Sequence, residues 1–281
     1  MAVVTQPDRP AGRGQKLQSS AVKTIASQLG IDVLQPESVR EIVPQLRALE
    51  AELFVVASYG EILAQSVLDI PRAGAFNVHP SLLPLYRGAT PLQSQIRDRC
   101  TVTGVTIIAM DAGMDTGDVL IREQVPLGPR ETFGELEARL AELGAQALVR
   151  AIERAERGQL VPVAQTGLAP QAQIDATLTR PLRTADLRID WTRAAADVDA
   201  LVRSLSPQPC ARGEIAGVGA KIVATHLLGT ATLLAPGTPS RIPHGLSVAC
   251  GDGAVAIDRI VPANRSAMSG EAFAASLFAR S

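Results

Sequence analysis

The sequence predicts an α/β fold in which a mostly parallel, doubly wound sheet is followed by a small OB-like β-barrel. Up to residue 162, short apolar runs alternate with amphipathic stretches, which is typical of strands interleaved with helices. After residue 186, short apolar runs are separated by Gly and Pro turns, which is typical of a small barrel. Residues 163–186 are rich in Ala, Gln, Thr and Pro and predict a linker. We therefore expect domains at 1–162 and 187–281.

The chain is large enough for this division. With 281 residues it has room for two domains, and its 46% hydrophobic and 20% charged content is that of an ordinary globular protein.

Helix signals in the first domain occur where the alternation predicts helices. Ser19 or Ser20 can cap a helix that ends at Gly30, and Thr132 and Glu135 form a capping box for the last helix. The expected strands are 2–4, 31–34, 53–57, the run ending at 79 and the run starting at 105. The expected helices are 20–30, 39–51, 61–68, 91–99 and 132–158.

The second domain predicts one helix followed by short strands. The helix is expected at 194–204, and the strands at 221–226, 232–234, 246–249 and 254–260.

Several classes of protein are excluded by composition. The longest apolar runs, such as 105–110, are far too short to span a membrane, and no signal peptide can be read at the N-terminus. Cys100, Cys210 and Cys250 are too few and too widely spaced for a disulfide framework or a metal cluster. We expect a cytoplasmic protein without membrane attachment or metal.

The net charge of −1 hides a difference between the two halves. Residues 180–281 carry 11 Lys and Arg against 8 Asp and Glu, so the second half is mildly basic. This bias is compatible with a polyanionic partner, although ordinary scatter of surface charge explains it equally well.

Asn77 and His79 lie at the end of an apolar strand, where open α/β sheets place their ligands. Side chains two residues apart on a strand project to the same side, so the amide and the imidazole can hold one substrate oxygen between them. A histidine alone on such a strand is more often structural, and it is the neighbouring Asn77 that favours catalysis.

A glycine-rich loop, 111–118, follows the next strand and carries Asp111, Asp115 and Asp118. Three carboxylates could indicate an ion-binding loop, but their spacing does not alternate as calcium ligands do. A carboxylate at Asp115 that orients and charges His79 is the simpler interpretation.

Near the chain start, a Pro- and Gly-containing loop carries Arg9, Arg13 and Lys16. Such a loop is often a solvated turn. Cations on a loop beside an active site can also hold phosphates, and arginine can do so with two hydrogen bonds.

These residues together resemble the 10-formyltetrahydrofolate-dependent formyltransferases, and among them the methionyl-tRNA formyltransferases. The segments that carry the resemblance are TQPDRPAGRG at 5–14, FNVHPSLLPLYRGATP at 76–91, TGVTIIAMDAGMDTGDVL at 103–120 and RIDW at 188–191. The Asn-x-His pair with SLLP and the later Asp is shared by all such formyltransferases, whereas the first and last segments are more specific to the tRNA enzymes.

The resemblance implies transfer of a formyl group from 10-formyltetrahydrofolate to the α-amine of initiator methionyl-tRNA, without a metal. Asn77 and His79 would stabilise the oxyanion of the tetrahedral intermediate, and Asp115 would orient His79 and help to move protons. The barrel at 187–281 would hold the tRNA backbone, and the enzyme would act as a monomer. The implied folate-binding residues are Tyr59, Gly60, Ile62, Leu63, Ser81, Leu82, Leu83, Pro84 and Asp111, and the implied tRNA-binding residues are Arg9, Arg13 and Lys16.

Members of this family begin with a strand-helix unit ahead of the loop at 5–14, and this chain starts almost at that loop. The sequence therefore predicts a formyltransferase sheet that is truncated at its N-terminus, with neighbouring strands left uncovered. Two alternatives stay open here. One is a folate-dependent formyltransferase acting on another amine acceptor, and the other is a catalytically impaired remnant that still binds tRNA.

Overall fold

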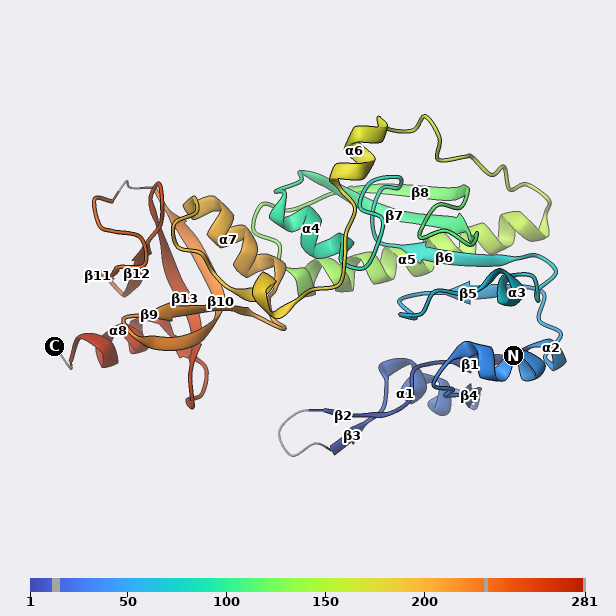
Figure 1. Ribbon diagram of the computed structural model, residues 1–281, viewed down its shortest axis with the longest axis horizontal. Helices are drawn as coiled ribbons and strands as arrows, with labels where there is room; N and C mark the ends of the chain where they lie inside the picture. The colour runs from blue at the N-terminus through green and yellow to red at the C-terminus, as the bar shows by residue number, and fades with distance from the viewer. Residues whose placement is uncertain (12–15, 230–231, 280–281) are drawn as a thin grey trace. The chain divides into compact units, whose positions relative to one another are not determined.

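The computed structural model describes residues 1–11, 16–229 and 232–279 (Figure 1). The chain divides into two compact units, each built from several stretches of chain. The first unit comprises Met1–His79, Thr106–Arg122 and Gly144–Ala169, and the second comprises Pro80–Val105, Glu123–Leu143 and Pro170–Ser281. The domain limits expected from the sequence stay a prediction.

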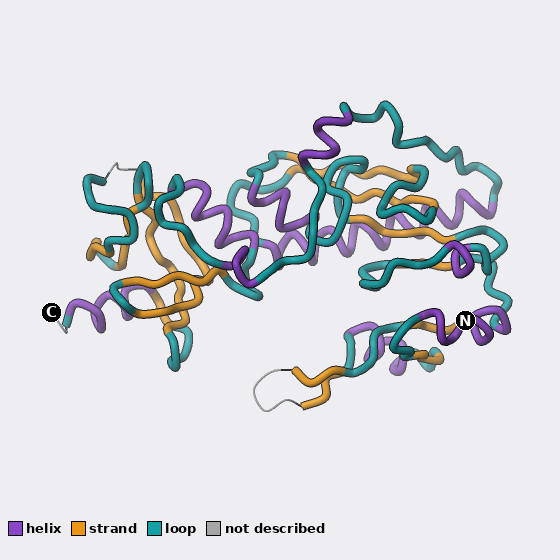
Figure 2. Tube along the Cα trace, in the orientation of Figure 1, coloured by secondary structure: helices purple, strands orange, loops and turns teal. Residues whose placement is uncertain are grey.

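Helices and strands alternate through the first part of the chain, as expected (Figure 2). The strands are β1 Ala2–Val4, β2 Arg9–Ala11, β3 Lys16–Gln18, β4 Asp32–Leu34, β5 Phe54–Val56, β6 Ala75–His79, β7 Val102–Ala109 and β8 Val119–Pro126. The helices are α1 Ala21–Gln28, the 3₁₀ turn η1 Val39–Ile42, α2 Val43–Ala48, α3 Gln65–Leu68, α4 Pro91–Arg97 and α5 Phe133–Glu156.

The strands of the first part form more than one sheet. β1 pairs with β4 in parallel, whereas β5, β6, β7 and β8 form a separate four-stranded sheet in that order. Within the second sheet β5 and β6 are parallel, but β6 and β7 are antiparallel. β5 is an edge strand of this sheet, and its central residue Val55 is 47% exposed.

An apolar cluster stabilises the first unit. Helical residues such as Leu46 and Val67 are almost fully buried against Ala75 of β6, and Phe54 and Met110 pack at the edge of the cluster. Burying such side chains contributes about 1.5–3 kcal/mol each, so the cluster holds β6 and the end of β7 in fixed positions.

The second unit contains an antiparallel sheet with the strand order β11-β12-β13-β10-β9, and β14 pairs with β13. A large apolar cluster beneath this sheet includes Val202, Ile222 and Ile260, each with no exposed surface. The elements of this part are α6 Gln171–Ala176, the 3₁₀ turn η2 Thr184–Leu187, α7 Ala195–Ser204, β9 Ala211–Ile215, β10 Val218–Leu228, β11 Pro239–Ile242, β12 Gly245–Ala249, β13 Ala254–Pro262, β14 Met268–Ser269 and α8 Gly270–Phe278.

The capping signals of the sequence are confirmed. The Ser20 hydroxyl accepts a hydrogen bond from the Lys23 amide at 3.0 Å, and Gly30 has a positive φ of 68° just after α1. The Glu135 carboxylate accepts from the Thr132 amide at 2.9 Å, which completes the predicted capping box.

Three expected elements were wrong in detail. The helix expected at 61–68 is only α3, because Glu61 instead accepts hydrogen bonds from Ser38 and Val39 and holds the chain in a loop. The strand expected at 232–234 is a loop, and the strand forms further along as β11. The loop expected at 5–14 contains β2, which pairs with β3 in a hairpin.

Candidate active site

Asn77 and His79 lie on the same side of β6, in the first unit. The register of β6 with β7 places Asn77 opposite Ile108 and His79 opposite Thr106. His79 is 4% exposed and Thr106 is fully buried, so the imidazole is held in a packed environment. Because strand side chains alternate, the amide and the imidazole project toward one position beside the sheet.

The loop after β7 is folded by its own side chains. The Asp111 carboxylate accepts hydrogen bonds from the Gly113 amide at 3.0 Å and the Thr116 hydroxyl at 2.7 Å. At Gly117 a side chain would overlap the carbonyl oxygen of Ala109, so only glycine permits this close approach. The loop therefore turns back toward the sheet instead of extending away from it.

Asp115 is the residue that this loop presents to His79. Its carboxylate oxygen Oδ1 lies 3.6 Å from the imidazole Nδ1 of His79, and the two side chains are 17% and 5% exposed. Asp115 has a φ of 57°, which is uncommon for a residue other than glycine and is found at functional sites. A carboxylate at this distance can orient the imidazole and stabilise its protonated form. The catalytic roles that the sequence analysis gave to Asn77, His79 and Asp115 stay a prediction.

Gln165 supports this loop and was missed by the sequence analysis, which placed it in the linker 163–186. Its side-chain amide donates to the carbonyl of Asp115 at 2.9 Å and to the carbonyl of Gly117 at 2.7 Å, and Gln165 is 4% exposed. Val163, two residues earlier, pairs with Val119 of β8 through two backbone hydrogen bonds. A single Gln in a segment without periodicity carries no sequence signal that could have identified this role.

The loop after β5 contains the expected folate residues of the first unit. The Tyr59 hydroxyl is buried and has no hydrogen-bond partner in the described part of the chain, and burial raises its pKa, as the nearby Glu61 also does. Gly60 has a φ of 84°, Ile62 is 72% exposed, and Leu63 is buried in the apolar cluster. An unsatisfied buried hydroxyl suits a ligand with polar atoms, because such a ligand would restore the missing hydrogen bond.

The expected folate residues that follow His79 belong to the second unit. The Ser81 hydroxyl donates to the carbonyl of Leu85 at 2.7 Å, and Ser81 and Leu83 have no exposed surface. Leu82 packs close to Gly104, where a larger residue would collide with it. The turn Ser81–Pro84 is therefore a rigid element that starts two residues after His79.

Of the expected tRNA-binding residues, Arg9 is described in full. Its guanidinium Nη2 lies 3.0 Å from the Glu37 carboxylate, and both side chains are more than half exposed. Such an exposed pair contributes little stability and can open for another anion. Lys16 pairs with Ala11 through the backbone of the hairpin, and Arg13 lies outside the described residues.

Asp8 anchors this hairpin to the body of the first unit. Its carboxylate accepts hydrogen bonds from the Lys23 ammonium at 2.7 Å, the Gln35 amide at 2.8 Å and the Ser19 hydroxyl at 3.2 Å. The bond from Lys23 and then that from Gln35 lower the pKa of Asp8. The basic hairpin therefore starts from a fixed point.

Within the described residues, no group of three or more His, Cys, Asp or Glu side chains could hold a metal ion. Asp111 is engaged by its own loop, as described above.

Comparison with known proteins identifies the family. The sequence matches the formyl transferase family over residues 1–152, more than half of the chain, and the formyl transferase C-terminal domain over residues 181–277. The chain is a formyl transferase. Both matched regions agree with the α/β class and the C-terminal β domain expected from the sequence, and the site around His79 lies within the first of them.

Individual relatives cover most of the chain. A methionyl-tRNA formyltransferase of Stutzerimonas stutzeri is 43% identical over 265 residues, which are 92% of this formyl transferase and 81% of the relative. A methionyl-tRNA formyltransferase of Dinoroseobacter shibae is 44% identical over 268 residues, which are 95% of this chain and 85% of the relative. One of Chloroflexus aggregans is 42% identical over 283 residues, which are 99% of this chain and 90% of the relative.

Solved structures share the fold of this formyl transferase at lower identity. HypX from Aquifex aeolicus in complex with tetrahydrofolic acid gives a TM-score of 0.65 at 17% identity, covering 90% of this chain and 43% of HypX. The sugar 3N-formyl transferase WlaRD gives a TM-score of 0.64 at 17% identity, covering 94% and 88%.

Proposed function

We propose that this formyl transferase moves a formyl group from 10-formyltetrahydrofolate to the α-amine of initiator methionyl-tRNA. The observation that carries the proposal is the buried His79 imidazole 3.6 Å from Asp115, with Asn77 beside it, in a chain 42–44% identical to methionyl-tRNA formyltransferases. Sugar formyltransferases share the fold at only 17% identity, so they give no comparable support for a sugar acceptor.

Each residue of the trio has a separate role in this proposal. The Asn77 amide and the His79 imidazole donate hydrogen bonds to the formyl oxygen, on which negative charge develops as the amine attacks the formyl carbon. The Asp115 carboxylate lies on the Nδ1 side of His79, where it fixes the ring and supports its N–H donor. Asp115 also helps to move the proton that the amine must lose.

The folate supplies the activated formyl group when it is bound. Tyr59 fits this ligand because its buried hydroxyl requires a polar partner. With it we propose Gly60, Ile62, Leu63, Ser81, Leu82, Leu83, Pro84 and Asp111 as the folate-binding residues. For tRNA we propose Arg9, Arg13 and Lys16, whose charges would hold phosphates of the acceptor end.

We further propose that the enzyme acts as a monomer in the cytoplasm, where translation begins. None of the helices in the described residues is both long enough and apolar enough to cross a lipid bilayer.

Single-turnover formyl transfer tests the proposed function. The 281-residue chain is mixed with 10-formyltetrahydrofolate and initiator methionyl-tRNA, and formyl-methionyl-tRNA is measured over time. We expect transfer by the intact chain and a loss of about 10²-fold or more in D115N, because the neutral amide no longer supports the imidazolium. Absence of transfer in the intact chain, with an amino-sugar nucleotide formylated instead, would refute the proposal.

Removing the Gln165 side chain should slow formyl transfer although Gln165 is not itself a catalytic residue. Q165A removes the two hydrogen bonds from this side chain to the carbonyls of Asp115 and Gly117, which costs about 1–3 kcal/mol, and it loosens the loop that holds Asp115. We expect kcat to fall about tenfold or more with little change in the KM for folate. Gln171, which pairs with Asp175 on the exposed face of α6, provides the matched control Q171A. Equal kcat values for the two variants would contradict the role of Gln165.

A further inference from the structure

The strand that carries His79 leaves the β6–β7 ladder directly after that residue. His79 is paired with Thr106 and is the last residue of β6 to be paired with β7. The next residue is Pro80, which has no backbone N–H to donate to a neighbouring strand. Beyond His79 the course of the chain therefore has to be fixed by contacts other than the ladder.

A buried glutamine supplies one of these contacts. Gln95 lies on α4, is 2% exposed, and its side-chain amide donates to the carbonyl of Pro80 at 3.0 Å. The same amide nitrogen donates to the carbonyl of Pro91 at 3.0 Å, at the start of the helix. Both N–H groups of the side chain are thus used. The sequence placed Gln95 only within an expected helix and gave it no role.

Thr103 of β7 holds the other side of the Gln95 amide. Its hydroxyl is 1% exposed and donates to the side-chain oxygen of Gln95 at 2.7 Å. Thr103 lies three residues before Thr106, the partner of His79. Gln95 therefore connects β7 to the residue that follows β6, at the point where the two strands cease to pair. Gln95, Pro80 and Thr103 all belong to the second unit.

Packing alone does not explain a glutamine at this position. The turn after His79 already has an apolar contact with β7, where Leu82 packs close to Gly104. An apolar side chain of similar size would fill the space of Gln95 without the cost of burying an amide. A buried amide that is held by Thr103 and donates to Pro80 fixes direction as well as distance, because hydrogen bonds require alignment. The network therefore specifies one position of the Pro80 carbonyl.

We propose that Gln95 is a positioning residue for formyl transfer, because by holding the Pro80 carbonyl it fixes the backbone at His79 and with it the direction of the imidazole. The link to His79 is the covalent chain. The peptide bond between His79 and Pro80 is planar and the proline ring fixes φ, so only the ψ angle of Pro80 separates this peptide from the carbonyl that Gln95 holds. The inference rests on the proposed function, because it takes the reaction from it.

The histidines of the chain give a readout that does not depend on activity. There are three of them, so the NMR signals of their ring C–H groups can be assigned with one alanine variant each. Q95M replaces the amide by an apolar side chain of similar shape. It should shift or broaden the signals of His79 and leave those of His226 and His244 unchanged. Q171M, on the exposed face of α6, is the matched control and should move none of them. Unmoved His79 signals in Q95M would overturn the proposal.

Formyl transfer gives the second readout. Q95M should lower kcat about tenfold or more, because misplacing a catalytic group by about 1 Å can cost about 10²-fold, and the KM for folate should change little. Conservative replacement at the neighbouring position tests the hydrogen bond itself. T103S keeps the hydroxyl that holds Gln95 and should retain a higher kcat than T103V, which removes it. Equal kcat values for T103S and T103V would contradict the proposed network.

The double variant Q95M/T103V separates positioning from stability. Replacing both partners of a buried hydrogen bond by apolar groups of the same shape is often nearly neutral, whereas replacing one partner is costly. We expect the urea midpoint of the double variant to lie closer to that of the unaltered chain than the midpoint of Q95M does. Its kcat should stay as low as that of Q95M, because Pro80 still lacks the bond from Gln95. Recovery of kcat together with the midpoint would show a merely structural role and overturn the proposal.

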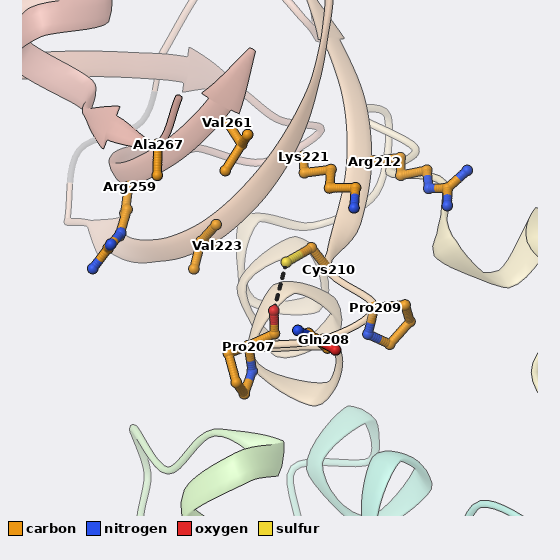
Figure 3. Close-up of a pocket in the computed structure, with 10 residues that line it drawn as sticks. All are labelled: Pro207, Gln208, Pro209, Cys210, Arg212, Lys221, Val223, Arg259, Val261 and Ala267. Atoms are coloured by element: carbon orange, nitrogen blue, oxygen red, sulfur yellow. Dashed lines mark hydrogen bonds between the residues drawn. The ribbon is translucent and has the colours of Figure 1, made fainter. Parts of the chain in front are cut away.

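The split between kcat and KM separates positioning from binding of RNA. In the C-terminal domain, which the family resemblance links to tRNA, a groove of about 650 Å³ has Lys221 and Arg212 at one end and Arg259 at the other (Figure 3). Gln95 does not line this groove. We therefore expect Q95M to leave the KM for methionyl-tRNA unchanged. A rise in this KM with an unchanged kcat would contradict the proposal.

The two readouts allow this proposal and the proposed function to fail separately. Formyl transfer by the unaltered chain with an equal kcat in Q95M would remove the role of Gln95 and leave the proposed function. Movement of the His79 signals in Q95M, in a chain that transfers no formyl group, would remove the proposed function and leave Gln95 as the residue that positions His79.

Discussion

Replacing His79 by alanine should reduce the kcat of formyl transfer by about 10³-fold, or about 4 kcal/mol of transition-state stabilisation. The imidazole is 4% exposed and lies 3.6 Å from Asp115, so H79A removes a buried hydrogen-bond donor whose orientation the neighbouring carboxylate fixes. The interaction with the formyl oxygen strengthens only as charge develops there. We therefore expect the affinity for folate to change little, because H79A removes an interaction made mainly in the transition state and not one made equally in the ground state.

A second histidine provides the matched control for this experiment. His226 also pairs with a carboxylate, with Nδ1 2.7 Å from Asp258, but both side chains are about half exposed. H226A should keep nearly full activity. Turnover of H79A within a few-fold of the unaltered chain would show that the assignment of Asn77, His79 and Asp115 is wrong.

Replacing Asp199 by alanine should lower the free energy of unfolding of the second unit by about 3–5 kcal/mol. The Asp199 carboxylate is 3% exposed and accepts hydrogen bonds from Arg203 Nε at 2.8 Å, Arg130 Nη1 at 2.9 Å and the Thr225 hydroxyl at 2.9 Å. Arg203 is itself 8% exposed. Without Asp199 its guanidinium would stay buried with no opposite charge, which is the costly half of a broken ion pair.

Trp191 provides the measurement of this loss. It is the single tryptophan of the chain, it belongs to the second unit, and its indole N–H donates to the carbonyl of Glu214 at 3.2 Å. Urea unfolding followed by its fluorescence should give a lower midpoint for D199A. D258A removes a carboxylate from an exposed pair and should cost less than about 1 kcal/mol. Similar midpoints for the two variants would contradict the importance of the buried network.

Local sequence signals predicted secondary structure correctly where residues close together in the chain determine it. The α/β alternation and the β-rich C-terminal part are confirmed, as are the caps at Ser20 and Thr132, because caps depend on residues three positions apart. The helix expected at 61–68 was wrong because Glu61 bonds to Ser38 and Val39, far earlier in the chain. Long-range hydrogen bonds of this kind override local propensity and leave no local pattern.

The sequence by itself determined the family of this protein and the residue types of its site, since Asn77, His79 and the loop with Asp115 belong to short motifs with fixed spacing. Only the tertiary structure decided which groups support or extend that site. Gln165 reaches Asp115 from 50 residues away, and Asn77 and His79 lie opposite Ile108 and Thr106 only through the register of β6 with β7. Such sets are created by the pairing of distant segments, and sequence order alone does not contain the register that brings them together.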